Sequence, residues 1–407
     1  MTVHYFSKLM RIATKTVHKL NGAIHESSIR RNLNKTNPPF GETCDFVVFF
    51  ADPLEQIYQV TQWIKPLESL SSSEQTVGFV VADPFVAREL AMQTRLPIFL
   101  TRSMESYENF VLEREVRGVF YVNNSQANFT ALRITSPTHI HLNHGESDKV
   151  SMVSNQLKAY DFAFVAGDAA VERIKSAIRR FNADRLYTIG RPQLDNQPSN
   201  PAQRNASRIE VLYAPTWEGD SRHMAYGSLP SMGAAIIEEL LNDTRFTVVF
   251  RPHPKSGTWS KETRKALNHL ENRISKASAL DPVAGHRTDR TTDATAAMFN
   301  SDVVIGDNSA MTMDAVGLNK PILLSMSEAM RLQSATSTST QRTVEALRHI
   351  GPENTGRIAD LVVEVAAAPI PPSQLVLRDR VFGSESLGTG TERFIRAAKL
   401  AIEDTAG

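Results

Sequence analysis

The chain has 407 residues, of which 41% are hydrophobic and 22% charged, and its 45 Lys and Arg residues nearly balance 44 Asp and Glu residues. This composition excludes a disordered or fibrous protein, and the charge balance argues against a general nucleic-acid binder, which needs a strongly basic surface. Cys44 is the single cysteine, which excludes an intramolecular disulfide and a zinc site made of several thiolates. The length predicts two domains.

The hydropathy pattern contains no run near the roughly 18 apolar residues that a membrane-spanning helix needs. No apolar segment with a small-residue cleavage site opens the chain. We therefore expect a cytoplasmic protein.

Positive charge is concentrated in residues 1–35, where seven cations and one anion give a net charge of +6. Apolar side chains recur there at the spacing of one helical face, at Phe6, Leu9, Met10, Ala13, Val17 and Leu20. A basic amphipathic helix of this kind can lie in an anionic membrane interface, which would make the protein peripheral at the inner face of the membrane. The alternative is a helix whose apolar face packs on its own protein, and the sequence leaves both open.

After this arm, short β-branched and aromatic runs alternate with helical patterns, which is typical of βαβ units on a parallel sheet. We predict strands of a first half at residues 46–50, 77–81, 97–100, 118–122, 139–143, 162–165 and 186–189, with helices at 53–64 and 169–181 among others. Residues 190–201 contain three prolines, and we expect a linker there. A second half follows, with strands at 210–213, 247–250, 303–305 and 322–324 and helices at 232–241, 261–274, 310–318 and 391–402.

The expected fold class is α/β, with two Rossmann-like wound domains that face each other across a cleft, as in GT-B enzymes. Ligands of such folds bind at the carboxyl ends of the strands. We assign residues 1–35 to the basic arm, 36–195 to an N-terminal domain, and 206–407, including the terminal helix, to a C-terminal domain. Some epimerases and periplasmic-type binding proteins share this architecture, so the fold does not choose a function by itself.

Several motifs that bind phosphate or carry out hydrolysis are missing. The chain has no Gly-x-x-x-x-Gly-Lys-Ser/Thr loop, no Asp-x-Asp pair and no Gly-x-Ser-x-Gly elbow. We therefore expect no metal site and no cofactor, and we expect phosphate charge to be stabilised by histidine, arginine and helix N-termini.

Two histidines follow predicted strands at positions suited to catalysis. His144 ends the strand at 139–143, and Gly145 permits a sharp turn or the close approach of a ligand. A histidine at such a place can act as a general base near neutral pH, or it can cap a loop. His253 lies between two prolines at another strand end, beside Arg251, whose guanidinium suits phosphate oxygens. The alternative for Arg251 is a structural ion pair.

Two further strand ends carry candidate binding residues. Thr216 follows a predicted strand in an Ala-Pro-Thr-Trp segment, where it can contact a ligand or cap the next segment. Asn308 or Ser309 is expected to cap a helix that starts at Ala310, whose first-turn N–H groups would form an anion site. Asp314 lies on the same helix and could reach ribose hydroxyls. The alternative is an ordinary capped helix.

Together these segments resemble the CDP-glycerol glycerophosphotransferase family of teichoic acid synthesis. The matching segments are His144-Gly145, Tyr213-Ala-Pro-Thr-Trp217, Arg251-Pro-His253-Pro254, Asp307-Asn-Ser309-Ala-Met-Thr-Met-Asp314 and the closing residues 388–395. The order and approximate spacing of the family's motifs are kept over residues 137–325. The chain departs from the pattern at Asn143, where the family usually has Trp, at residues 146–148, and at Ala310, where the family has a second Ser.

The resemblance implies a transferase that moves glycerol-phosphate, or a related polyol-phosphate, from a CDP-activated donor to an acceptor hydroxyl in cell-surface polymer synthesis and releases CMP. It implies that His144 is the general base, that Arg251 and His253 stabilise the diphosphate, and that the N-terminal and C-terminal domains bind acceptor and nucleotide donor respectively. The expected partners are a CDP-polyol donor, a polyol-phosphate or lipid-linked glycan acceptor and an anionic membrane surface, but no nucleic acid.

Two alternatives stay open at this point. A GT-B glycosyltransferase that uses a sugar nucleotide would share the fold but release a nucleoside diphosphate. A non-catalytic scaffold that binds nucleotide ligands would bind the donor without turnover.

Overall fold

The computed structural model describes residues 27–33, 35–147, 153–195, 207–219, 227–291, 293–334, 338–384 and 388–403. Residues 1–26 of the predicted amphipathic arm lie outside the described residues, as does the second half of the expected linker, residues 196–201. Ile29 and Leu33, in the described helical end of the arm, are buried in the first hydrophobic core. The described end of the basic segment therefore packs on the protein itself.

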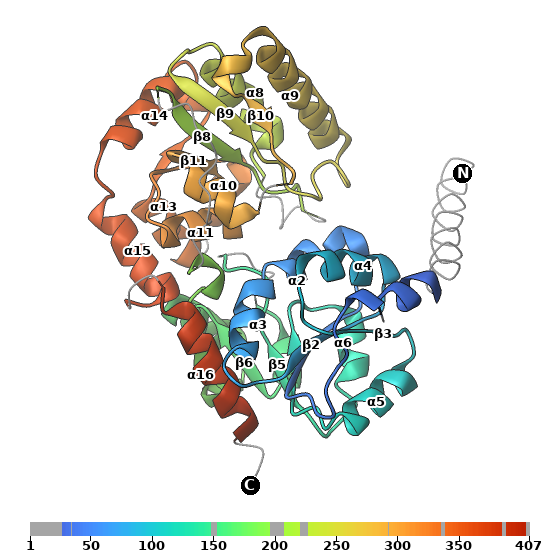
Figure 1. The fold of residues 1–407 in the computed structure, drawn as a ribbon. Helices are drawn as coiled ribbons and strands as arrows, with labels where there is room; N and C mark the ends of the chain where they lie inside the picture. Colours follow the sequence, from blue (N-terminus) through green and yellow to red (C-terminus); the bar gives the residue numbers. More distant parts are fainter. Residues whose placement is uncertain are drawn as a thin grey trace, which may run out of the picture.

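The first half contains a seven-stranded parallel sheet in the order β3-β2-β1-β4-β5-β6-β7. It occupies the lower part of Figure 1. Its strands are β1 (Phe46–Phe50), β2 (Val77–Val81), β3 (Ile98–Leu100), β4 (Gly118–Tyr121), β5 (Thr138–His141), β6 (Phe162–Val165) and β7 (Leu186–Thr188). β1 and β2 are buried along their whole length, as expected for parallel strands covered on both faces, and this explains their continuous apolar sequences. The seven strands predicted for this half are confirmed, with ends shifted by at most two residues.

The helices of the first half are α2 (Tyr58–Thr61), α3 (Ile64–Ser71), α4 (Pro84–Gln93), α5 (Met104–Glu113), α6 (Gln126–Ala131) and α7 (Asp168–Ala177). The single helix expected at 53–64 is instead a 3-10 turn at Leu54–Gln56 followed by α2, and α3 then extends beyond the predicted end. Pro66 lies in the first turn of α3, where the missing N–H of proline costs no helical hydrogen bond.

The second half contains a six-stranded parallel sheet in the order β10-β9-β8-β11-β12-β13. Its strands are β8 (Ile209–Ala214), β9 (Phe246–Phe250), β10 (Arg287–Thr288), β11 (Val303–Gly306), β12 (Ile322–Ser325) and β13 (Arg348–Ile350). The four strands predicted here are confirmed. The edge strands β10 and β13 were missed because they are two and three residues long and carry mostly polar side chains.

The helices of the second half are α8 (Leu229–Leu241), α9 (Lys261–Leu280), α10 (Ala294–Asn300), α11 (Ala310–Gly317), α12 (Glu328–Ser334), α13 (Thr338–Ala346), α14 (Ile358–Ala367) and α15 (Pro372–Phe382). Among the described helices, none is by itself long and apolar enough to cross a membrane. α14 and α15 reach that length and composition only as a pair, which is bent by 78°.

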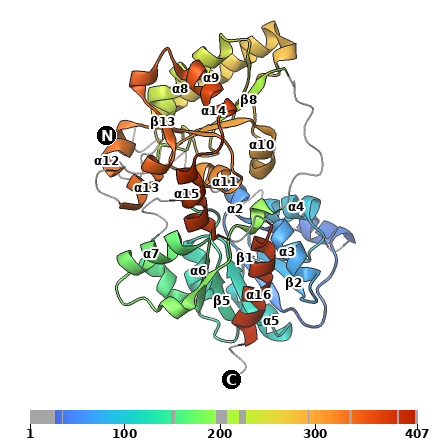
Figure 2. The same cartoon turned by 90° about the vertical axis from the view of Figure 1, so that its left-hand side faces the viewer.

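The last helix, α16 (Gly390–Glu403), returns to the first half. It lies alongside the first sheet next to α3 (Figure 1, Figure 2). The ring centroid of Phe394 is 5.5 Å from that of Trp63 and 5.6 Å from that of Phe120. The terminal helix therefore packs on the N-terminal half, and not on the C-terminal domain to which the sequence analysis assigned it. Its amphipathic sequence shows an apolar face but not which sheet that face covers.

Candidate active site

Each sheet has one point where the winding of the chain reverses, between β1 and β4 in the first and between β8 and β11 in the second. Connections leave such a point toward opposite faces, which opens a crevice at the carboxyl ends of the strands. In the first sheet Asn123 Nδ2 donates to Asp52 Oδ2 at 2.8 Å across this point. In the second sheet Thr216 N donates to Asp307 Oδ2, also at 2.8 Å. Sequence analysis identified the second pair of strand ends and missed the first.

His144 follows β5 on a turn that its neighbours hold in place. Asn143 adopts a left-handed backbone conformation (φ 62°), and its Oδ1 accepts a hydrogen bond from His144 N at 2.8 Å. Trp63 Nε1 donates to the Asn143 carbonyl oxygen at 2.8 Å. His144 Nδ1 lies 3.2 Å from the carbonyl oxygen of Val122, which can only accept. Nδ1 therefore carries the proton, and Nε2 of the neutral ring holds the lone pair that a general base needs.

His253 follows β9 and has the opposite tautomer. Lys255 N donates to His253 Nδ1 at 3.1 Å, so the proton of the neutral ring lies on Nε2. The ring of Trp217 stacks on His253 with a centroid distance of 6.2 Å and an angle of 23°. Lys255 Nζ is 5.2 Å from the centroid of Trp217, which is a cation–π contact. His253 Nε2 is thus a hydrogen-bond donor, and the Trp217 ring that stacks on His253 also contacts the Lys255 ammonium.

Tyr58, the first residue of α2, connects the two histidines across the two halves of the molecule. Its ring centroid is 6.1 Å from that of His144 and 5.9 Å from that of His253, with edge-to-face angles of 85° and 80°. Burial raises the pKa of the Tyr58 hydroxyl, so the phenol is neutral at physiological pH. Sequence analysis missed this residue, because a tyrosine in a predicted helix has no distinctive pattern. The one signal that could have identified Tyr58 is that it follows the carboxyl end of β1, where ligands of such folds bind.

The turn before α11 is tied to the end of β8. Ser309 caps the helix, because its Oγ accepts from Thr312 N at 3.4 Å. Asp307 Oδ2 accepts from Thr216 N at 2.8 Å and from Ser228 N at 3.0 Å. The free N–H groups of the first turn of this eight-residue helix therefore lie at the carboxyl edge of the second sheet, where an anion can bind.

Asn308 lies within this turn and is fully buried, with 0% of its surface exposed. Neither polar atom of its amide has a hydrogen-bond partner within the described part of the chain. An unpaired buried amide costs roughly 1–3 kcal/mol, so Asn308 is suited to pair with a ligand.

The predicted residues Gly145 and Ala310 meet across the two halves. A Cβ added to Gly145 would lie 2.8 Å from the Cβ of Ala310, the first residue of α11. The turn that carries His144 therefore contacts the start of α11 directly, and a larger side chain at position 145 would push the halves apart. The close approach that glycine permits here is one of protein to protein.

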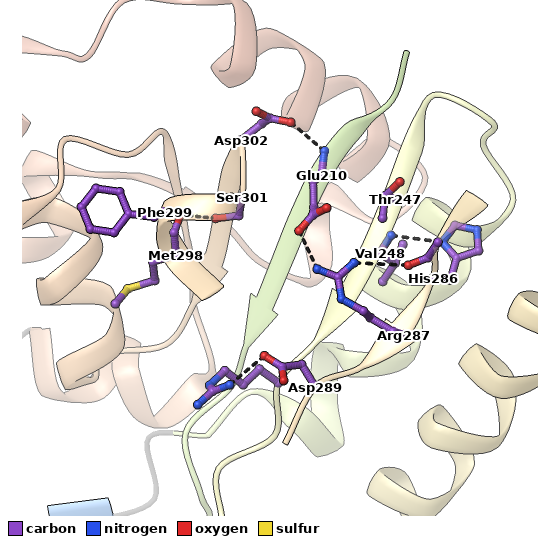
Figure 3. A network of polar contacts seen from close by, with 12 residues as sticks. Glu210, Thr247, Val248, His286, Arg287, Asp289, Met298, Phe299, Ser301 and Asp302 are labelled. Carbon is purple, nitrogen blue, oxygen red and sulfur yellow. Dashed lines mark hydrogen bonds and ion pairs between the residues drawn. The ribbon is translucent and has the colours of Figure 1, made fainter. Parts of the chain in front are cut away.

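Arg251 forms an ion pair with Asp289, with 2.7 Å between Nη1 and Oδ2 (Asp289 is labelled in Figure 3). Asp289 is buried and the Arg251 side chain is 19% exposed. Arg251 therefore forms the structural ion pair that sequence analysis gave as the alternative to phosphate binding. Its positive charge is already balanced by Asp289 in this structure. Sequence spacing did not show this pair because Asp289 follows the unpredicted strand β10.

Figure 3 shows the polar network that holds β10 against its neighbours. Arg287 Nη2 donates to Glu210 Oε1 at 2.8 Å, and Val248 N donates to His286 Nδ1 at 3.0 Å. Burial lowers the pKa of His286, and the charge of Arg208 lowers it further, so the ring stays a neutral acceptor. The network thereby fixes the strand that positions Asp289.

Asp314 also has a different partner from the one predicted. Its two carboxylate oxygens accept from Arg191 at 2.9 and 3.1 Å, and both side chains are less than 10% exposed. Burial raises the pKa of Asp314, while the charge of Arg191 opposes that rise. The Asp314 carboxylate thus joins α11 to the segment after β7, and its contact with ribose hydroxyls stays a prediction. The two residues are 123 positions apart, so local spacing could not reveal the pair.

The structure places the remaining predicted residues at the facing edges of the two sheets: His144, Gly145, Thr216, His253, Asn308, Ser309 and Ala310. Among the residues that the structure describes, no three His, Cys, Asp or Glu side chains are grouped so as to hold a metal ion.

Two facing parallel sheets with histidines at their junction define a two-domain α/β enzyme of the GT-B type. The chain belongs to the CDP-glycerol:poly(glycerophosphate) glycerophosphotransferase family, whose model matches residues 112–338. It is therefore an enzyme of the CDP-glycerol glycerophosphotransferase class. The matched range contains both histidines and the start of α11, whereas Tyr58 precedes it.

Solved structures with the same fold include enzymes of different activities. A putative UDP-N-acetylglucosamine 2-epimerase from Listeria monocytogenes has a TM-score of 0.58 at 14% identity, covering 89% of this chain and 98% of its own. The S. aureus MnaA–UDP structure has a TM-score of 0.57 at 14% identity, with coverages of 89% and 97%. A His-to-Asn variant of the wall teichoic acid polymerase TagF, soaked with CDPG, has a TM-score of 0.54 at 14% identity and 100% coverage of both chains. At such identities the likeness shows the fold alone. A search of curated protein sequences found no significant match.

Proposed function

We propose that the chain transfers glycerol-phosphate, or a closely related polyol-phosphate, from a CDP-activated donor to an acceptor hydroxyl in the synthesis of a teichoic-acid-like polymer, with release of CMP. Family membership supports the class of reaction. The observation that carries the assignment of residues is the arrangement around Tyr58, where His144 has a lone pair on Nε2 and His253 has a proton there.

In the proposed mechanism His144 Nε2 takes the proton of the acceptor hydroxyl as the oxygen attacks the phosphorus that carries the glycerol. The bond from this phosphorus to the CMP oxygen breaks, and negative charge develops on the leaving phosphate. His253 Nε2–H donates to a diphosphate oxygen, and Lys255 and the first turn of α11 favour the same charge. Because Arg251 is already paired with Asp289, we expect it to contribute less to phosphate binding than His253.

The donor and product are tested by incubating the protein with CDP-glycerol, other CDP-polyols and UDP-sugars in the presence of a short poly(glycerol phosphate) acceptor. We expect CMP and lengthening of the acceptor with a CDP-polyol. Release of a nucleoside diphosphate would point to glycosyl transfer, and donor binding without turnover would point to a scaffold. Either result would contradict the proposal.

His144→Ala should lower kcat by about 10²–10⁴, the usual cost of losing a general base, while donor affinity stays within a few-fold. The matched control is His269→Ala, which removes an exposed histidine of α9. Both variants are compared by CMP release and by calorimetric titration of CDP-glycerol. Retention of most activity in His144→Ala would remove this residue from the mechanism.

We also propose that the protein is peripheral at the cytoplasmic face of an anionic membrane, through the basic segment at residues 1–35. The net charge of +6 supports this, since each Lys or Arg near such a surface contributes about 1 kcal/mol. Because Ile29 and Leu33 belong to the first core, the informative deletion is 1–26.

The deletion removes four of the seven cations and the apolar helical face, so it should strongly weaken sedimentation with anionic vesicles and spare turnover of a short soluble acceptor. High salt should release the full-length chain from the vesicles. Equal binding to neutral vesicles, or none to anionic ones, would end the membrane proposal.

A further inference from the structure

A small cavity lies at the carboxyl edge of the first sheet, behind the turn that carries His144. Its volume is about 40 Å³, room for roughly two or three water molecules or for the end of a small polar ligand. Gly145 and Glu146, after β5, form one wall, and Gln193, after β7, forms another. Arg173 of α7 also lines the cavity.

Two neutral side chains of this cavity have unused hydrogen-bonding capacity. His141 is 3% exposed and Gln193 is 7% exposed. Neither His141 Nε2 nor either amide atom of Gln193 has a hydrogen-bond partner within the described residues. Burial, with a smaller effect from His144, lowers the pKa of His141 to about 3, so its ring is neutral. Because native proteins rarely leave such atoms unpaired, their presence together indicates a ligand or ordered water.

The charges around the cavity are already compensated. Arg173 is paired with Glu146, and Arg191, which also lines the cavity, is paired with Asp314. Both arginines that line the cavity therefore have a carboxylate partner within the protein. The unused atoms comprise both donors and acceptors, which matches hydroxyl groups, and Trp63 and Ile174 provide apolar wall for carbon atoms.

We propose that this cavity is a subsite for a neutral polyol end, such as the non-reacting hydroxyls of a glycerol unit of the acceptor. Gly145 forms part of its wall while His144, the preceding residue, contacts Tyr58, so an acceptor held here lies next to the catalytic turn. The identity of the ligand as part of an acceptor rests on the proposed function. The presence of a hydroxyl-binding cavity does not.

The direct test uses glycerol as the probe and the full-length chain. Gln193→Met keeps the length of the side chain and removes the amide, and Gln93→Met makes the same change on the exposed face of α4. Saturation-transfer NMR should detect glycerol with the wild type and Gln93→Met, and the signal should fall roughly tenfold in Gln193→Met. 1-Propanol, which has the same carbon chain and one hydroxyl, should give a weaker signal that the substitution does not change. No glycerol signal with the wild type, or an equal one in Gln193→Met, would mean that the cavity holds water only.

Kinetics separate this inference from the proposed function. With turnover established, Gln193→Met should raise the acceptor KM by roughly tenfold, more than any change in kcat, and leave the Kd of CDP-glycerol unchanged. An unchanged acceptor KM would overturn the subsite while the transferase activity stands. If no donor is turned over but glycerol binding is lost in Gln193→Met, the subsite stands and the proposed function fails. Should Gln193→Met not fold, His141→Asn is used with the same readouts and the same expected losses.

Discussion

The ring of Tyr58 contacts both His144 and His253, which come from different halves of the molecule. We therefore expect this one side chain to position the two imidazole rings relative to each other. Tyr58→Phe keeps the ring, and we expect its kcat/KM to stay within about threefold of the wild type. Tyr58→Leu loses the edge-to-face contacts and should lower kcat/KM by about tenfold, or ~1.4 kcal/mol. CMP release measures both, and thermal unfolding checks that the variants fold. Equal activity of the two variants would show that the ring has no positioning role.

His253 and Arg251 should respond differently to substitution, although both lie in the same loop. His253→Ala should weaken binding of CDP-glycerol more than binding of cytidine, because a hydrogen bond to a charged phosphate is worth about 1.5–3 kcal/mol. Arg251→Ala removes the guanidinium that balances the buried charge of Asp289, so it should lower the free energy of unfolding more than it lowers donor affinity. Calorimetry and urea unfolding compare the two. Equal loss of cytidine and CDP-glycerol affinity in His253→Ala would place this residue away from the diphosphate.

At the level of elements, helix α11 has two roles, because its first turn faces the site while Asp314 ties it to Arg191. Arg191→Met would leave the buried carboxylate unpaired and should destabilise the fold by up to about 3–5 kcal/mol, less if Asp314 takes up a proton. The double variant Arg191→Met/Asp314→Leu should recover much of this loss, because neither charge remains buried. A double-mutant cycle from urea unfolding measures the coupling. A double variant no more stable than Arg191→Met would show that the pair is not the source of the loss.

For the whole molecule, buried neutral histidines predict how stability depends on pH. Burial lowers the pKa of His139, His141 and His286 below the ordinary value of 6.5. Their contribution to stability is therefore complete above about pH 7 and declines as the pH falls below 6.5, because the unfolded chain binds protons that the folded chain does not. For His141 the decline continues to about pH 3. Urea unfolding at pH 7.5, 6.5 and 5.5 should show a falling free energy of unfolding, and His286→Gln should make that fall shallower. A free energy that rises on acidification would contradict this account.

The sequence by itself determined the features that depend on a few neighbouring residues. Fully buried parallel strands are apolar runs such as Phe46–Phe50, and the strand-end segments at His144, Thr216, His253 and Ser309 follow such runs directly. Because parallel strands end at the same edge of a sheet, the alternation of strands and helices along the chain indicated the fold class, and these motifs indicated the residues that meet at the facing edges.

Only the tertiary structure decided which distant residues meet. Tertiary packing pairs Asp314 with Arg191 and Arg251 with Asp289. It also decides which sheet α16 covers and places Tyr58 between the two histidines. The tautomers of His144 and His253 follow from one backbone carbonyl and one backbone N–H, which no residue type encodes. The physical reason is that hydrophobic patterns and backbone preferences act over a few residues, whereas ion pairs, ring contacts and hydrogen-bond partners are set by proximity in space.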